Sequence, residues 1–281
     1  AGSRCLDGMD PSRCMRRAIL RECRRLGPRW VPSPPACDFL WGRGHYVDPK
    51  VPHPVLSRLA PDCLQEGLCG GRRPLTPWIR SLIRKAGDAK SSVESDEVLK
   101  FLKEQGALSA CTSSSSEEGL CVDTVSGFAR SASQAESGQF VFAYNMRFTN
   151  TGSRNVRVLA RQYDFRDASG ELASRIEHQQ PEAAGVVGFT PLLKPGECFE
   201  FGSGVVLRTP RGSVVGRFLS MVEPDLSGED ARMHEEMEKA ELMLRFVYFR
   251  GLETKQFHVP LGQLRFDADV RCVSLIPARS R

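Results

Sequence analysis

The chain has 281 residues, of which 41% are hydrophobic, and a formal net charge of +5. This composition excludes a disordered chain of low hydrophobicity and high net charge, and it suits one large globular domain or two smaller ones. No run of about 18 apolar residues occurs, which excludes a conventional membrane-spanning helix.

The positive charge is concentrated in the first third of the chain. Residues 1–90 contain 17 Lys and Arg against 8 Asp and Glu, whereas residues 91–281 contain 22 against 26. This asymmetry favours two domains and predicts an acidic partner for the first, either nucleic acid or an acidic protein; a well-solvated basic surface is the alternative. The ten cysteines include no C-x-x-C pair, so free thiols in a reducing compartment are expected.

The opening stretch, AGSRCLDGMDPSRCMRRA, is rich in arginine and has no apolar secretory core. It is either the end left after a presequence was removed or a retained basic leader. A helix is predicted from Pro11, which suits a first turn, to the residue before Gly27. Its apolar stripe contains Met15, Ile19, Cys23 and Leu26. Its remaining surface carries Arg16, Arg17, Arg21, Arg24 and Arg25.

Residues 28–77 are rich in proline and glycine, which predicts an irregular, extended segment that drapes over a partner surface. Helical periodicity then resumes between residues 76 and 111. One helix is marked by Trp78, Leu82 and Ile83, and the next by Val98, Leu99 and Leu102. The sequence therefore predicts an N-terminal unit, residues 1–111, of three helices with a long insertion after the first.

The polar stretch TSSSSEEG, residues 112–119, is predicted to be a linker. Beyond it the apolar pattern has a period of two. One face of a strand is formed by Phe140, Phe142, Tyr144, Met146 and Phe148. Turn sequences NTGS, DASG, KPGE and TPRG separate further strands. Six or seven short strands predict an antiparallel sandwich or barrel.

One helix is predicted to interrupt these strands at about residues 225–245, with Ser227 as its N-cap. Its apolar stripe contains Met233, Met237, Ala240 and Leu244. We expect this stripe to pack on the sandwich; a partner-binding helix is the alternative.

Three stretches of the C-terminal part resemble the ApaG domain: FVFAYNMRFTNTGSRNVRVLARQYDFRDASGE, GVVGFTPLLKPGECFEFGSGVVLRTPRGSVVGRF and FHVPLGQLRF. The resemblance implies an immunoglobulin-like β-sandwich over residues 120–273, with a tail at 274–281. The fold class is then α+β. The outward-facing Arg147, Arg157 and Arg161 are expected to form an interaction surface.

Members of that family also tend to have a G-x-G-x-x-G stretch, which reads AAGVVG here. Ala183 occupies the first glycine position, Gly185 the second and Gly188 the third. A phosphate-binding loop needs a helix directly after it, and the following FTPLLKPGE cannot begin one. The stretch is therefore expected to be a structural turn.

The helical unit resembles the LYR-motif family, three-helix mitochondrial proteins that bind acyl carrier protein. In MRRAILRECRRL, Arg17 occupies the motif arginine, Met15 the leucine position and Arg16 the position where tyrosine is usual; Ile83 replaces a usual phenylalanine. The resemblance implies an acidic acyl carrier protein as partner, whose acylated phosphopantetheine would be the only cofactor involved. The candidate contacts are Arg16, Arg17, Arg21, Arg24, Arg25, Arg80, Arg84 and Lys85. The candidate acyl-channel residues are Met15, Ile19, Leu82, Leu99 and Leu102. Ribosomal RNA could use the same arginines through long-range charge.

No hydrolase elbow, P-loop, H-E-x-x-H or paired Cys/His signature occurs, so catalytic residues are not predicted. One set of possible metal ligands contains Cys37, His45, His53, Cys63 and Cys69. Its irregular spacing favours buried thiols and surface histidines over a zinc site. Asp164, Asp167 and Glu171 surround a turn and are expected to be turn formers.

Together, the two family resemblances and the missing catalytic signatures imply a non-enzymatic structural or assembly subunit of a large complex in the mitochondrial matrix. The mitochondrial ribosome is the first expectation, because extended basic segments lie along RNA. An accessory subunit of a respiratory-chain or ATP synthase complex is the second expectation. A small-molecule or nucleotide-binding ApaG module is the third.

Overall fold

A computed structural model describes residues 11–26, 43–47, 96, 98–100, 102–103, 106–107, 109–177, 184–252 and 254–270. The chain divides into two compact units. The first contains Ala1–Pro34 and Asp48–Ala110, and the second contains Pro35–Val47 and Cys111–Arg281. The later division point lies one residue from the predicted end of the N-terminal unit.

The first unit contains the helix α1 (Pro11–Leu26), whose predicted bounds are confirmed. Ile19 and Cys23 are buried, as their places on the apolar stripe require. The described residues 98–100, 102–103 and 106–107 are helical and lie within the last predicted helix of this unit. The helix predicted around Trp78 lies outside the described residues.

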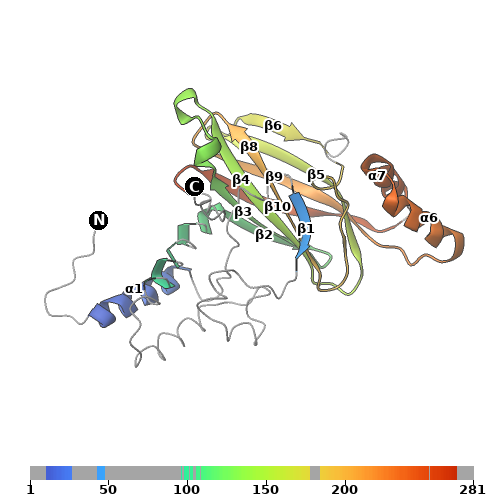
Figure 1. The fold of residues 1–281 in the computed structure, drawn as a ribbon, viewed down its shortest axis with the longest axis horizontal. Helices are drawn as coiled ribbons and strands as arrows, with labels where there is room; N and C mark the ends of the chain where they lie inside the picture. The colour runs from blue at the N-terminus through green and yellow to red at the C-terminus, as the bar shows by residue number, and fades with distance from the viewer. Residues whose placement is uncertain are drawn as a thin grey trace, which may run out of the picture. The chain divides into compact units, whose positions relative to one another are not determined.

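The second unit is a sandwich of two antiparallel sheets, as predicted (Figure 1). The first sheet contains, in spatial order, β1 (Arg43–Val47), β8 (Cys198–Leu207), β4 (Phe140–Asn150), β3 (Leu120–Phe128) and β2 (Thr112–Glu117). The second contains β10 (Gln256–Asp267), β9 (Arg211–Val222), β5 (Val156–Asp167) and β6 (Leu172–Ile176), with the short β7 (Leu192–Leu193) beside β5. Short 3-10 turns occupy Ser109–Cys111, Arg130–Ala132 and Ala135–Ser137.

Aromatic side chains fill the space between the sheets. Phe148 of β4 meets Phe218 of β9 edge to face, with ring centroids 4.8 Å apart. Phe142, also in β4, lies 5.2 Å from the Phe266 ring of β10. The alternation of β4 thus directs its apolar side chains across the sandwich, and each such pair adds about 0.5–1.5 kcal/mol beyond the area that it buries.

The turn predicted after β4 joins the two sheets rather than two neighbouring strands. Asn150 stabilises this corner: its side-chain amide donates to the carbonyl oxygens of Arg154, at 2.7 Å, and Leu193, at 2.8 Å. Its side-chain oxygen accepts from the backbone N–H of Gly152 at 2.9 Å. The apparent repeat of two alternating strands in the sequence therefore corresponds to strands in opposite sheets.

A β-bulge in β5 reverses the side-chain alternation of that strand. Val158 pairs with Ser220 and Ala160 with Leu219, so Leu159 is the additional residue. Val158 faces the sandwich core, whereas Leu159 and Ala160 pack on the outer side of the sheet. One extra residue exchanges the two faces of a strand, which a sequence period of two does not reveal.

Two expectations about polar and proline-rich segments need correction. The predicted linker at residues 112–119 contains β2, which pairs with β3 along its whole length. Its serines and threonine suit an exposed edge strand, where polar side chains limit unwanted pairing. Residues 43–47, within the segment expected to drape over a partner, form β1 and pair instead with β8 of the same chain.

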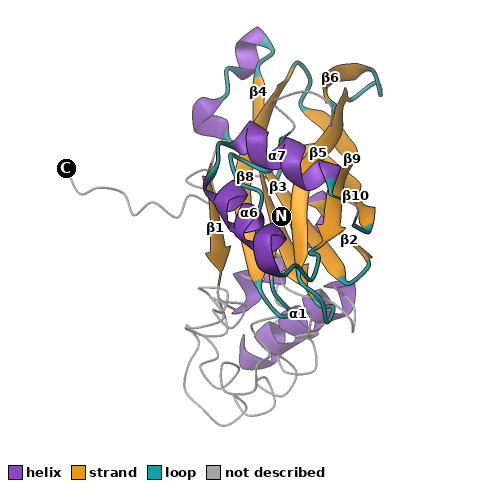
Figure 2. Ribbon diagram, turned by 90° about the vertical axis from the view of Figure 1, so that its right-hand side faces the viewer, coloured by secondary structure: helices purple, strands orange, loops and turns teal. Residues whose placement is uncertain are grey.

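The predicted single helix near 225–245 is two helices, α6 (Gly228–Lys239) and α7 (Leu242–Gly251), separated at Ala240 and Glu241. Ser227 has the N-cap position but makes no capping hydrogen bond with its side chain. Figure 2 shows the two helices in front of the sheet that contains β5. The predicted packing stripe was wrong at two of its four positions: Met233 and Leu244 are exposed, whereas Met237 and Ala240 are half-buried. The fully buried residues of the insertion are Phe246 and Phe249.

Candidate interaction site

The most distinctive polar group of the sandwich is the buried Arg157. It lies on β5 between Val156 and Val158, both of which face the core. Its own side chain faces away from the core, toward α6 and α7, and has no exposed surface. Because burying an unpaired charge is very costly, this guanidinium needs close partners.

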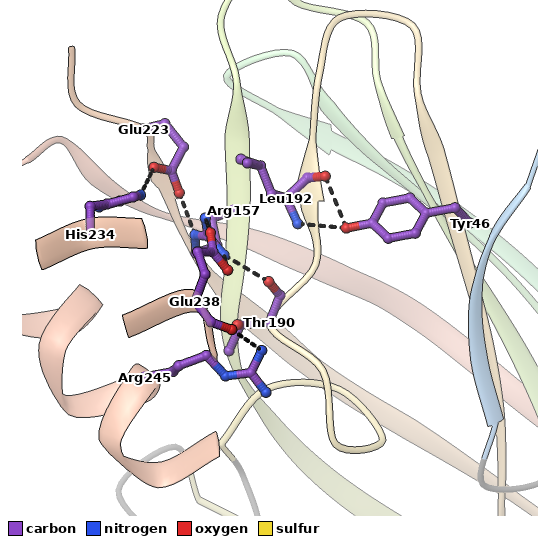
Figure 3. Close-up of polar contacts among 8 residues, drawn as sticks. All are labelled: Tyr46, Arg157, Thr190, Leu192, Glu223, His234, Glu238 and Arg245. Atoms are coloured by element: carbon purple, nitrogen blue, oxygen red, sulfur yellow. Dashed lines mark hydrogen bonds and ion pairs between the residues drawn. The ribbon is translucent and has the colours of Figure 1, made fainter. Parts of the chain in front are cut away.

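Two carboxylates and one carbonyl surround the Arg157 guanidinium (Figure 3). Nε donates to Glu223, directly after β9, and Nη2 donates to Glu238 of α6. Nη1 donates to the second Glu238 oxygen and to the carbonyl oxygen of Thr190, each at 3.1 Å. Glu238 therefore binds Arg157 in bidentate fashion, the strong geometry for this pair.

Aromatic rings complete the site. The guanidinium carbon of Arg157 lies 4.0 Å from the centroid of the Phe249 ring of α7, a cation–π contact. His234 donates from Nε2 to Glu223 Oε2, 2.9 Å away. The His234 ring also lies 5.1 Å from Phe249, edge to face. Glu238 and His234 are four residues apart, so both lie on the same face of α6.

We name Arg157, Thr190, Glu223, His234, Glu238 and Phe249 the Arg157 clasp. Its members come from β5, the loop before β7, the end of β9, and both inserted helices. Both carboxylates accept hydrogen bonds from Arg157. The arrangement holds the helical insertion against the sheet and orients it.

The three arginines that we expected on one outward surface have different environments. Arg147 does face outward, where it pairs with Glu200 of the neighbouring β8. The prediction that Arg157 is a surface residue was wrong, because the helical insertion covers its side chain. Arg161 follows the bulge and pairs in register with the core residue Phe218. It donates to the carbonyl oxygen of Gly185 at 2.8 Å.

The glycine-containing stretch is a structural turn, as predicted. Gly185 and Gly188 have φ values of +61° and +87°, which favour glycine. A Cβ at Gly185 would lie 2.1 Å from the carbonyl oxygen of Phe189. The short strand β7 follows rather than a helix, so the geometry of a phosphate-binding loop is missing here. The acids of the neighbouring β5–β6 turn are also turn formers: Asp167 accepts from the backbone N–H of Ser169 at 2.9 Å.

The candidate residues of the N-terminal unit divide into an apolar and a basic group. Ile19 and Leu102 are buried, and Met15 and Leu99 are half-buried. Arg16 is half-buried, whereas four further arginines of α1 are exposed: Arg17, Arg21, Arg24 and Arg25. Arg25 also pairs with Glu22 at 3.6 Å. α1 thus presents a basic face and buries its apolar stripe.

Several candidates lie outside the described residues: Arg80, Leu82, Arg84, Lys85, Cys37, His53, Cys63 and Cys69. His45 is described and is exposed on β1. Within the described part of the chain, no group of three or more potential metal ligands occurs. None of the five cysteines described there is in a disulfide. None of the described helices is long and apolar enough to cross a membrane.

Comparison with known proteins gives the sandwich its family. The family model for the ApaG domain matches residues 130–222. The protein ApaG of Xanthomonas campestris pv. campestris (strain B100) is 39% identical over 93 residues, which are 33% of this chain and 68% of that protein. This chain belongs to the ApaG family. A second ApaG protein, from Rhodospirillum centenum, is 41% identical over 86 residues, 31% of this chain and 62% of that protein.

Among solved structures, a putative ApaA protein from Bordetella pertussis matches with 27% identity and a TM-score of 0.39. The match covers 53% of this chain and 92% of the Bordetella chain. The family match ends at Val222, directly before Glu223 and the helical insertion. Most partners of Arg157 therefore lie beyond the matched ApaG region.

Sequence reasoning missed Thr190, Glu223, His234, Glu238 and Phe249 as a site. Arg157 stands at an outward position of β5, and alternation correctly predicts that it faces away from the core. The available signal was the acidic insertion downstream, which could supply a countercharge to an arginine on the covered face. The sequence alone does not predict which face of the β5 sheet the helical insertion covers.

Proposed function

We propose that this protein is a non-enzymatic structural or assembly subunit of a large mitochondrial complex, with the mitochondrial ribosome as the first candidate. In this proposal the N-terminal unit docks an acyl carrier protein, and the ApaG sandwich is a scaffold that presents the helical insertion. The distribution of charge on α1 is the observation that carries the proposal.

The helix α1 contains six arginines and a single glutamate. Its apolar residues Ile19 and Cys23 are buried, whereas Arg17, Arg21, Arg24 and Arg25 are exposed. Arg17, Arg21 and Arg24 lie three or four residues apart, which places them along one side of the helix. A row of guanidinium groups suits the carboxylates and phosphate of an acyl carrier protein, because Arg binds both groups through two hydrogen bonds.

The resemblance of α1 to the LYR-motif family selects an acyl carrier protein over other acidic partners. Arg17 occupies the motif position, and the buried Ile19 and Leu102 are candidates for lining a channel for the acyl chain. RNA is the competing partner for the same arginines, and its binding would show a strong salt dependence.

The first test measures binding of the purified full chain to acylated acyl carrier protein. We expect Arg21→Glu with Arg24→Glu to raise the Kd more than about tenfold, equivalent to about 1.4 kcal/mol. Arg130→Glu with Arg208→Glu is the matched control, since both residues are exposed in the sandwich and form no ion pair among the described residues. The same overall change in charge should then have little effect.

Equal weakening by the two double variants would show that net charge alone drives binding and would refute a docking helix. If the chain binds duplex RNA and does not bind the carrier protein, RNA would be the partner of α1 in place of the carrier protein.

The second test concerns the host complex. The tagged protein is purified from mitochondria with and without RNase, and its companions are identified by mass spectrometry. Ribosomal proteins in an RNase-sensitive profile, together with an acyl carrier protein, are expected. Oxidoreductase or ATP synthase subunits, unaffected by RNase, would favour the respiratory alternative instead.

A further inference from the structure

The helix α7 has apolar side chains on both the covered and the open side. Phe246 and Phe249 are buried against the sheet. Leu244 and Val247 are 60% and 63% exposed on the other side. Leu244 and Val247 therefore form an exposed apolar patch on a helix whose other side is buried, and exposed apolar patches often mark interaction sites.

The exposed side of α7 is shaped as a helical stripe. Leu244, Val247 and Gly251 are spaced i, i+3, i+7 and therefore line one face. A Cβ built at Gly251 meets nothing within 4 Å, so the stripe ends in open space. Met243 is 39% exposed beside it, and its flexible side chain can adapt to a neighbouring surface.

Exposed acidic residues lie at the start of α7 and on the exposed face of α6. Glu241, directly before α7, is exposed and lies three residues before Leu244. On α6, Glu229, Met233 and Glu236 are all exposed and spaced i, i+4, i+7, so they share one face. By helical periodicity this face is opposite to His234 and Glu238, which belong to the Arg157 clasp.

Over residues 225–252 the exposed charged side chains are mostly acidic. The exposed carboxylates are Asp225, Glu229, Asp230, Glu235, Glu236 and Glu241. The exposed cations are Arg232, Lys239 and Arg250. This excess of negative charge disfavours nucleic acid and anionic lipid, and it opposes the approach of an identical surface from a second copy.

We propose that the outer face of α6 and α7 is a docking surface for a basic amphipathic helix of a partner protein. The apolar side of that helix packs on Leu244 and Val247, and its Lys and Arg side chains reach Glu229, Glu236 and Glu241. This is the helix-in-groove type of recognition, in which an apolar stripe supplies affinity and the surrounding charges supply orientation. The Arg157 clasp holds the surface in place before binding, which lowers the ordering cost.

The test measures binding of the full chain to a fluorescent Lys/Leu amphipathic peptide of about 18 residues, long enough to form a helix. A scrambled peptide of the same composition and a Glu/Leu amphipathic peptide are the controls. We expect the Lys/Leu helix to bind, the scrambled peptide to bind at least tenfold more weakly, the Glu/Leu helix not to bind, and added salt to weaken the complex.

Two protein variants locate the surface. Leu244→Ser with Val247→Ser is expected to weaken binding more than tenfold, and Glu236→Gln with Glu241→Gln to weaken it and reduce its salt dependence. Leu172→Ser with Val206→Ser is the matched control, because these residues are 45% and 57% exposed on the sandwich. All three changes are at exposed positions, and circular dichroism verifies the fold of each variant.

Equal binding of the scrambled or Glu/Leu peptide, or equal weakening by the matched control, would overturn the proposal. A chain that is dimeric in sedimentation and becomes monomeric only in the Leu244→Ser/Val247→Ser variant would also overturn it, because a second copy would then cover α7. Failure of this test leaves the function of α1 unaffected, since the two surfaces are tested by different variants.

Discussion

Replacing Arg157 by methionine tests whether the clasp holds the insertion. The substitution removes the cation from between Glu223 and Glu238 while keeping a long apolar side chain against Phe249. The side chain of Glu223 is only 8% exposed, whereas that of Glu238 is 33% exposed and can turn toward water. The buried, unpaired carboxylate of Glu223 should therefore account for most of the lost stability.

Removing one partner of a buried ion pair costs about 3–5 kcal/mol, because the remaining charge is left uncompensated. We expect Arg157→Met to lower the free energy of unfolding by an amount in this range. Glu238→Gln should cost less, about 1 kcal/mol, because its carboxylate is partly solvated. Replacing Arg157, Glu223 and Glu238 together by neutral residues should cost less than Arg157→Met alone, since no unpaired charge remains.

Urea unfolding measures the free energy, and hydrogen exchange shows where the structure loosens. Faster exchange is expected in α6 and α7, with β3, β4 and β8 still protected. Arg147→Met is the matched control: its pair with Glu200 is partly exposed, at 27% for Arg147 and 14% for Glu200, so less stability should be lost than on replacing the fully buried Arg157. An Arg157→Met variant no less stable than Arg147→Met, with unchanged exchange in the helices, would refute the clasp.

Three further predictions concern the sandwich. Gly185→Ala should destabilise the sandwich by about 2–3 kcal/mol, because the new Cβ would clash with a carbonyl oxygen and alanine is strained at positive φ. Gly188→Ala should cost only about 1 kcal/mol, because the space around Gly188 is open. Thermal unfolding compares the two variants, and equal losses of stability would contradict the clash at Gly185. The Arg175 guanidinium lowers the pKa of the Asp164 carboxyl, so this pair stabilises the fold at neutral pH, and its contribution is lost as pH falls through the folded-state pKa. Asp164→Asn should remove this part of the acid dependence of stability, measured by urea unfolding from pH 7 to pH 3. An unaltered pH dependence in the variant would argue against the pair. Burial raises the pKa of Tyr163 well above its usual value, so the stability of the fold should decrease as pH rises above about 10, where the tyrosine of the unfolded chain ionises. Tyr163→Phe should reduce this loss of stability at alkaline pH. An identical loss in the variant would contradict its assignment to Tyr163.

The amino-acid sequence alone determined some of the local and repetitive features. The apolar stripe of α1 and its proline start predicted that helix, because helix formation depends on residues three and four apart. The alternation from Phe140 to Phe148 predicted a strand with one buried face. The motif-level likeness to ApaG domains was confirmed for the sandwich.

Only the tertiary structure decided which faces are covered and where distant segments meet. Arg157 and Arg147 have the same apparent place in an alternating pattern, yet one is buried and the other lies at the surface. The bulge at Leu159 shifts the alternation by one residue, and the insertion more than 60 residues downstream covers the outer face of β5. Both effects depend on contacts between parts of the chain that are far apart in sequence, and hydrophobic periodicity, which reports only local neighbours, carries no record of them.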